Sequence, residues 1–153
     1  MDEHKNSLGR WISLLHRYGH VYVGRQLKQY NIGKGQYTFL NALYKKDGVR
    51  QEQLSDYLKI DKGTTAKAIK KLEDDEYIIR KVDTKDKRAY NVYLTDKALK
   101  IKPLVRKTMT DWLNILFLGF SEEEKKTSLS LLERMGKNAT TFTHDYFDND
   151  EVH

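Results

Sequence analysis

The most informative part of the chain is residues 51–95, which read QEQLSDYLKIDKGTTAKAIKKLEDDEYIIRKVDTKDKRAYNVYLT. Apolar residues at helical spacing predict a short helix that ends at Leu58 and a second helix from Lys62 to about Asp75. Asp61 is a good N-cap for the second helix. Because only the three residues 59–61 separate them, the two helices are expected to form a helix-turn-helix.

Two short segments with strand character follow this pair of helices. Residues 77–82 are β-branched and aromatic, and residues 90–94 alternate in polarity. The polar, turn-prone segment 83–89 lies between them and is basic. A hairpin with a basic tip after a helix-turn-helix is the pattern of a winged helix.

Helices are also predicted on both sides of residues 51–95. On the N-terminal side, apolar periodicity predicts a long helix over residues 6–29 and a shorter one that carries Tyr37, Leu40, Leu43 and Tyr44 and ends near Asp47 and Gly48. On the C-terminal side, a helix is expected from Thr95 or Asp96 to about Leu118. Its Pro103 predicts a kink or a delayed start.

A final helix is predicted from a capping box, in which Ser121 is followed three residues later by Glu124. Apolar residues at helical spacing continue it through Tyr146, and the tail that follows is acidic. The expected fold class is therefore mainly α, a winged helix-turn-helix with a small β-hairpin wing and long flanking helices.

The composition excludes several classes of protein. The 153 residues include no Cys, which excludes disulfides, Cys nucleophiles and Cys-based zinc sites. The longest apolar run, residues 115–118, is too short to span a membrane. The charged N-terminus lacks the apolar segment of a secretory signal. We therefore expect a cytoplasmic protein with no membrane partner.

The charge is unevenly distributed along the chain. The 28 Lys and Arg exceed the 22 Asp and Glu by six. Residues 59–108 carry a net charge of +7, whereas residues 109–153 carry −5. This asymmetry indicates an element that binds a polyanion beside a segment with a different role, although lysines also serve simply to solvate helix faces.

The helix that begins at Lys62 is the candidate recognition helix. If Ala66, Ile69 and Leu72 face the core, the opposite face carries ammonium groups, a hydroxyl and a methyl group, which suit the major groove of DNA. The alternative is an ordinary solvated lysine face. The residues predicted to contact DNA from this helix are Lys62, Thr64, Lys67, Ala68, Lys70 and Lys71.

The hairpin tip supplies a second set of candidate DNA contacts. Arg88 is expected to enter the minor groove, because a guanidinium matches the negative potential of narrow A·T-rich grooves. Asp86 is expected to orient it through a charge-assisted pair. Lys81, Lys85 and Lys87 are predicted phosphate contacts. The alternative is a turn that charged residues merely keep soluble.

With these features, the sequence resembles the MarR (multiple antibiotic resistance regulator) family of winged-helix transcription factors. The resemblance covers nearly the whole chain. Glu76 and Ala98 depart from it, because many relatives have Gly at both positions. The motifs that carry the resemblance are residues 36–40, 48–49, 54–55, 60–65, 72–73, 86–88 and 92–95.

The resemblance implies a homodimer that binds a pseudo-palindromic site in double-stranded DNA, usually as a repressor released by small aromatic acids or other ligands. It implies a single MarR-like chain over residues 1–153. Within it we expect a DNA-binding lobe at residues 33–95, a dimerisation lobe at residues 1–32 and 96–147, and an acidic tail at residues 148–153.

A dimer is also expected from the residues themselves. Long amphipathic terminal helices display more apolar surface than a small winged helix can cover, and two-fold pairing is the commonest solution. The alternative is packing of these helices within one chain. The predicted interface residues are Leu8, Trp11, Leu15, Trp112, Leu116, Leu132 and Phe142.

A possible effector site is implied by the resemblance. Arg17 is placed to meet a carboxylate, with Trp11, His20 and Tyr37 as candidate walls. Arg17 pairing with a carboxylate of the protein itself is the alternative.

Metal binding and catalysis are not expected. His16 and His20 lie four residues apart and share a helix face, but no third ligand is obvious nearby, so no metal or other cofactor is predicted. The sequence has no Gly-rich phosphate loop and no nucleophile motif, so an enzyme is not expected. The rival to a DNA-binding regulator is a winged-helix module that binds proteins or sequesters a ligand without binding an operator.

Overall fold

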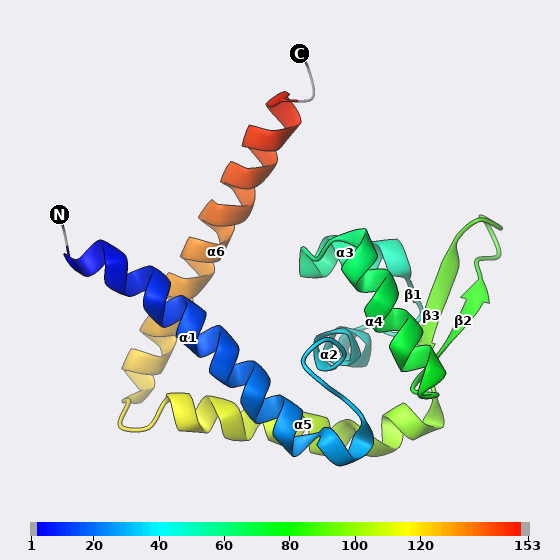
Figure 1. Cartoon of the computed structure of the whole chain (residues 1–153), viewed down its shortest axis with the longest axis horizontal. Coiled ribbons are helices and arrows are strands. Elements are labelled where there is room, and N and C mark those ends of the chain that lie inside the picture. The colour runs from blue at the N-terminus through cyan, green and yellow to red at the C-terminus, as the bar shows by residue number, and fades with distance from the viewer. Residues whose placement is uncertain (1–2, 151–153) are drawn as a thin grey trace. The chain divides into compact units, whose positions relative to one another are not determined.

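The computed structural model describes residues 3–150, and the side chains of residues 7–142. Helices dominate this part of the chain, and two strands of a small sheet form a hairpin between α4 and α5 (Figure 1). Two compact units are present, one up to Leu113 and the other from Asn114. The elements are α1 (Glu3–Gln26), η1 (Lys28–Tyr30), α2 (Tyr37–Lys45), β1 (Val49–Arg50), α3 (Gln51–Leu58), α4 (Lys62–Asp74), β2 (Ile78–Val82), β3 (Tyr90–Leu94), α5 (Asp96–Leu116) and α6 (Glu122–Asp150).

The helix-turn-helix of α3 and α4 forms as the sequence predicts. Lys59 ends α3 in the left-handed conformation, with φ of 55°. The hydroxyl of Ser55 donates to the Ile60 carbonyl at 2.6 Å and lies 3.1 Å from that of Thr65. Because both Ser55 and Thr65 are buried, these hydrogen bonds fix the turn from within the interface between the helices.

The wing is an antiparallel sheet in the order β1-β3-β2. Its two longer strands match the predicted hairpin, with Arg80 opposite Val92. The sequence did not predict β1, which pairs Val49 with Val92 and Arg50 with Asn91. Two residues are too few to show the alternation by which a strand is recognised.

The connection between α4 and β2 is a Schellman turn. The Tyr77 N–H donates to the Leu72 carbonyl at 2.9 Å, and the Glu76 N–H donates to that of Glu73 at 3.0 Å. Glu76 has φ of 62°, so this chain places a glutamate in the left-handed conformation that Gly adopts at no steric cost. The Thr95 hydroxyl donates to the Glu76 carbonyl at 2.7 Å and ties the turn to the end of β3.

The two C-terminal helices begin where the sequence predicts. Helix α5 begins at Asp96, as expected, so of the two alternatives that Pro103 offered the delayed start does not occur. Thr95 explains the early start, because its side-chain oxygen accepts from the Ala98 N–H at 3.3 Å and caps the helix. Helix α6 begins after Ser121, as predicted, and continues through Asp150. Residues 151–153 of the predicted acidic tail lie outside the described residues.

The core of the first unit lies where α2, α3, α4 and the wing meet. Leu40, Leu43 and Val92 are fully buried within it. Tyr44 donates from its hydroxyl to the Ala98 carbonyl at 2.6 Å, and burial raises its pKa to about 12. Because α4 and the hairpin share this core, their positions relative to each other are fixed. No helix in the described residues is long and apolar enough to cross a membrane.

Candidate nucleic-acid interface

Helix α4 is held at its first turn by its N-cap. Asp61 accepts hydrogen bonds from the Thr64 N–H and the Thr64 hydroxyl, each at 2.7 Å. These two bonds lower the pKa of Asp61. Lys62, Thr64 and Lys67 are exposed, as predicted, although the Thr64 hydroxyl already donates to Asp61. The first two turns of α4 therefore present two ammonium groups to solvent.

The buried face of α4 differs from the predicted one at two alanines. Ala68 is only 4% exposed and lies in the core, so the prediction that it faces DNA is wrong. Ala66, which was expected to face the core, is exposed. The reason is that the core covers a broad stripe at positions 65, 68, 69 and 72, and Thr65 belongs to it because its hydroxyl bonds to Ser55.

Lys70 and Lys71 are engaged in contacts within the chain. Lys70 pairs with Asp74, one turn further along α4. Lys71 donates to the Asn31 carbonyl at 2.8 Å and lies 3.6 Å from the Asp75 carboxylate. Of the predicted lysines of this helix, Lys62 and Lys67 form no such contact with another residue in the described part of the chain.

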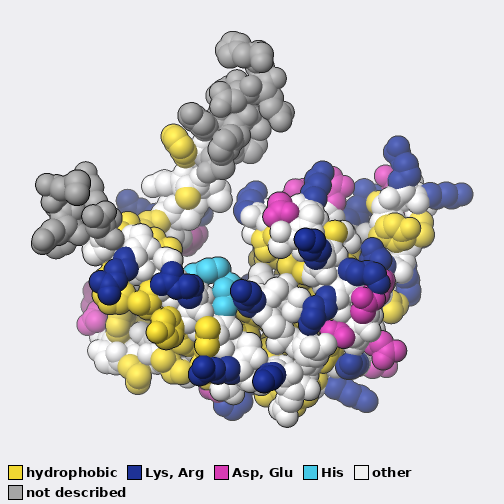
Figure 2. All heavy atoms as spheres, viewed as in Figure 1, with side chains coloured by type: hydrophobic (Ala, Val, Ile, Leu, Met, Phe, Trp, Pro, Cys, Tyr) yellow, Lys and Arg dark blue, Asp and Glu magenta, His cyan; other side chains and the backbone are white. Residues whose placement is uncertain are grey.

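The wing tip presents Arg88 to solvent, and 93% of its side chain is exposed. Asp86 accepts from the Arg88 backbone N–H at 3.0 Å and lies 3.4 Å from its Nε atom, so the predicted pair is present. Lys81, Lys85 and Lys87 are exposed. Figure 2 shows basic side chains, in dark blue, projecting from the wing at the upper right.

The wing tip is organised by Asp83, which the sequence did not single out. Its carboxylate accepts from the Lys85 N–H at 2.8 Å and the Asp86 N–H at 3.0 Å. It also lies 3.4 Å from Nε of Arg50 in β1. These backbone hydrogen bonds, from Asp86 and then Lys85, lower the pKa of Asp83 to about 2.

We expect Asp83→Asn to destabilise the protein near neutral pH and to remove part of its pH dependence. The folded state lowers the pKa of Asp83 from 3.8 to about 2, so its ionised form stabilises the fold above pH 4. As the pH falls from 4 to 2, the unfolded state binds the proton first and this stabilisation disappears. Urea unfolding at several pH values should show the difference between the two proteins shrinking over that range.

The control for this experiment is Asp56→Asn, which removes the same charge from the exposed surface of α3. A difference between wild type and Asp83→Asn that stays constant from neutral pH down to pH 2 would contradict the assigned role of Asp83.

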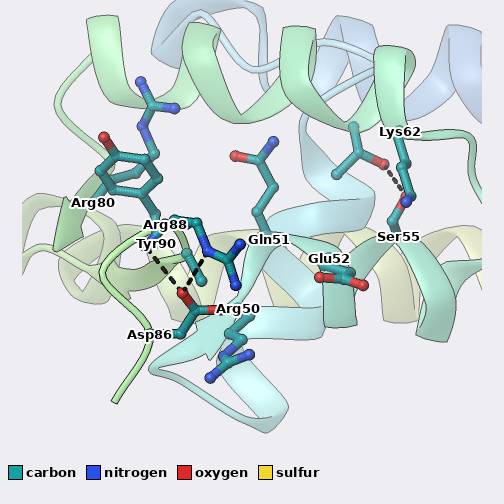
Figure 3. Close-up of a pocket in the computed structure, with 11 residues that line it drawn as sticks. Arg50, Gln51, Glu52, Ser55, Lys62, Arg80, Asp86, Arg88 and Tyr90 are labelled. Carbon is teal, nitrogen blue, oxygen red and sulfur yellow. Dashed lines mark hydrogen bonds and ion pairs between the residues drawn. The ribbon is translucent and has the colours of Figure 1, made fainter. Parts of the chain in front are cut away.

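A hollow of about 630 Å³ lies between the wing and the first turns of α3 and α4. Figure 3 shows Arg88 and Asp86, from the wing, beside Arg50 and Gln51 at the start of α3. The hollow contains four basic and two acidic side chains, so its net charge is positive. It is lined by Arg50, Gln51, Glu52, Ser55, Lys62, Thr65, Arg80, Asp86, Arg88, Ala89 and Tyr90.

Two arginines of this hollow were missed by the sequence reasoning. Arg80 forms a bidentate pair with Glu73, at 2.9 and 3.0 Å, and this pair lowers the pKa of Glu73. Arg50 is the N-cap position of α3, where Gln53 accepts from its backbone N–H at 3.0 Å. The only available signal was their basic character, which many surface residues share.

The predicted effector residues are brought together only in part. His20 lies 3.2 Å from the Tyr37 hydroxyl and 2.9 Å from His16, both measured from ring nitrogens. Partial burial, with the positive charge of His16 and Lys34, lowers the pKa of His20. Arg17 is exposed and donates to the Ser13 hydroxyl at 2.6 Å, with no carboxylate partner in the described part of the chain.

Trp11 lies nine positions before His20, which places it roughly 13 Å away along α1. Its ring is 54% exposed and packs against the Arg10 guanidinium. It is not part of a common wall with His20 and Tyr37. Among the described residues, no group of three or more His, Asp or Glu side chains is arranged to hold a metal ion.

Each unit has an exposed apolar face. Of the residues predicted for a dimer interface, five are between 41% and 68% exposed. Trp112 instead stacks on Tyr22 within the first unit, with ring centroids 5.3 Å apart, and Leu116 is half-buried. The five exposed residues are Leu8, Trp11 and Leu15 on α1 and Leu132 and Phe142 on α6.

Comparisons with known proteins agree with this geometry. The model of the MarR family matches residues 33–90. The HTH-type transcriptional regulator YybA of Bacillus subtilis is 35% identical over 113 residues, which cover 74% of this chain and 75% of that protein.

Two crystal structures extend the comparison. A MarR transcriptional regulator from Methanosarcina mazei Go1 is 46% identical, with a TM-score of 0.85 over 90% of this chain and 99% of the other. A putative MarR family regulator from Listeria monocytogenes, complexed with a 26mer DNA, is 28% identical, with a TM-score of 0.76 over 90% and 89% of the two chains.

Proposed function

Because the chain belongs to the MarR family of transcriptional regulators, we propose that it is a homodimeric repressor of a pseudo-palindromic operator, released by a small ligand. As a member of this family it is a DNA-binding transcription factor and not an enzyme. The observation that carries the proposal is the positively charged hollow that the exposed Arg88 of the wing lines together with Lys62 of α4.

The hollow suggests how the DNA backbone is held. A strand that passes from the major groove at α4 to the minor groove at the wing must cross the space between them. Arg50 and Lys62 line that space and supply positive charge for its phosphates. Phosphate contacts give affinity and register, whereas sequence preference comes from the exposed face of α4 and from Arg88.

The proposed dimer is supported by the exposed apolar faces of α1 and α6, which a second copy of the chain would cover. Two copies place two recognition helices on one duplex, which requires a site with two-fold symmetry. A ligand that binds better to a dimer with misplaced helices would lower operator affinity by a shift in population. The site proposed for such a ligand is at Arg17, His20 and Tyr37.

The proposal is tested by selection from a random pool of DNA duplexes, followed by binding of the selected duplex across a salt series. We expect an inverted repeat whose half-sites lie about one helical turn, or roughly 10 base pairs, apart. Affinity should fall steeply with salt because bound cations are released from the phosphates. Failure to enrich any sequence, with weak binding that salt barely changes, would contradict the proposal.

A further inference from the structure

Two histidines of α1 lie side by side at the surface of the first unit. The Nε2 atoms of His16 and His20 are 2.9 Å apart, and the ring planes meet at 80°. His16 is exposed and His20 is half-buried. Figure 2 shows histidine side chains, in cyan, grouped at the surface. The proposed operator surface uses neither residue.

The directions of the two rings bring both Nε2 lone pairs to one side. The side chains leave the same face of α1, because they are four residues apart. If the rings met end to end, the distance between their centres would exceed that between the nitrogens by a full ring width. The observed distances, 4.2 and 2.9 Å, differ by only 1.3 Å. The rings are therefore tilted, and the lines through their Nε2 atoms converge.

The distance between the nitrogens matches one coordination geometry of a metal ion. Ligands about 2.0 Å from a metal lie about 2.8 Å apart at adjacent corners of a square and about 3.3 Å apart in a tetrahedron. The observed 2.9 Å is closer to the square. Square-planar sites with nitrogen and oxygen ligands are typical of Cu²⁺ and Ni²⁺, whereas Zn²⁺ prefers the tetrahedron.

Tyr37 is in place to orient one of the two imidazoles. Its hydroxyl lies 3.2 Å from Nδ1 of His20, with the two ring centres 5.8 Å apart. When Nδ1 carries the proton, it donates to the hydroxyl oxygen, and Nε2 keeps its lone pair for a metal. A metal-binding histidine commonly makes such a bond, which fixes its tautomer and the direction of its ring.

The charges around the pair further restrict the ion. Partial burial and the positive charge of His16 and Lys34 lower the pKa of His20, so its ring is neutral near pH 7. A metal therefore has no proton to displace from this ring. The charge of Lys34 also repels a cation, so the site requires an ion with high affinity for imidazole. Among the common divalent metals, Cu²⁺ has the highest.

We propose that His16 and His20 bind Cu²⁺ through their Nε2 atoms, with Tyr37 positioning His20 and water completing the coordination. His16 then takes the tautomer with its proton on Nδ1, so two neutral rings lose no proton. The site shares His20 and Tyr37 with the proposed effector site but does not use Arg17. It does not depend on operator binding, so the two proposals fail separately.

The test uses a full-length protein in which these are the only two histidines. His4, His144 and His153 are replaced by Gln, because any histidine can bind Cu²⁺. Cu²⁺ is titrated in the presence of glycine, which keeps the free ion in solution, and binding is followed by calorimetry. We expect one tight site per chain, with two imidazole nitrogens in the electron paramagnetic resonance spectrum. Cu²⁺ should bind at least about tenfold more tightly than Zn²⁺.

Single substitutions in this protein test each part of the site. His16→Gln and His20→Gln should each weaken Cu²⁺ binding at least about hundredfold, because one of two ligands is lost. Tyr37→Phe keeps both ligands and should weaken it by only about tenfold. Lys34→Gln should strengthen it, because a repelling charge is removed. Thermal unfolding without metal checks that each variant is folded.

Three outcomes would overturn the proposal. The first is that the protein with only His16 and His20 fails to bind Cu²⁺ more tightly than glycine does. The second is an unchanged affinity in folded His16→Gln, which would place the ion elsewhere. The third is Zn²⁺ binding as tightly as Cu²⁺, which would contradict the square-planar arrangement.

Discussion

Arg88→Ala is expected to weaken binding to the selected operator by at least about tenfold, because an arginine contact to DNA contributes roughly 1–3 kcal/mol and a dimer loses two of them. The side chain is 93% exposed, and within the described residues its ion pair is with Asp86. The unfolding temperature and the dimer should therefore be unchanged. Fluorescence anisotropy with a labelled operator measures the effect.

The control is Lys100→Ala, which removes one positive charge from an exposed position on α5. It changes the net charge as Arg88→Ala does but lies outside the proposed interface. Equal losses of affinity in the two variants would show that only the total charge matters. Unchanged affinity in Arg88→Ala would reject the assignment of the wing to the minor groove.

Tyr77→Ala is expected to lower the free energy of unfolding by about 3–5 kcal/mol, the usual effect of truncating a large buried aromatic residue. Tyr77 is 1% exposed and stands at the turn between α4 and β2. Its hydroxyl donates to the Tyr30 carbonyl at 2.5 Å, and the Lys97 ammonium lies 4.4 Å from its ring centre. Thermal and denaturant unfolding at a fixed protein concentration measure the loss.

Tyr77→Phe separates the ring from the hydroxyl. This variant keeps the buried ring and loses one hydrogen bond, so it should be destabilised by only about 0.5–1.5 kcal/mol. If Tyr77→Ala unfolds too readily to measure, the smaller loss in Tyr77→Phe still tests the contact with Tyr30. Stability equal to that of the wild type in both variants would contradict the burial of this side chain.

The sequence predicted most elements of the fold because their signals are local. The N-cap at Asp61 and the apolar spacing of Ile69 and Leu72 mark α4 without reference to any other segment. Strand β1 was missed because it exists only through its pairing with β3. The error at Ala66 and Ala68 has a similar cause, since the inward position of Thr65 depends on Ser55 ten residues earlier.

The candidate site was predicted in part for the same reason. Arg88 stands in a recognisable turn, and Asp86 is near enough in sequence to be assigned as its partner. Arg50 and Arg80 could not be assigned, because folding brings Arg50 to Asp83, 33 positions later, and Arg80 to Glu73 across the turn. A single basic residue gives no indication of such a partner.

The Schellman turn at Glu76 also determines how far the wing lies from α4. Its two backbone hydrogen bonds, the bond from Thr95 and the bidentate pair of Glu73 with Arg80 all join the end of α4 to the base of the wing. These bonds therefore fix the distance between α4 and the base of the wing. An operator read by both must keep a constant number of base pairs between the two contacts, and a one-base-pair insertion there would put one contact out of reach.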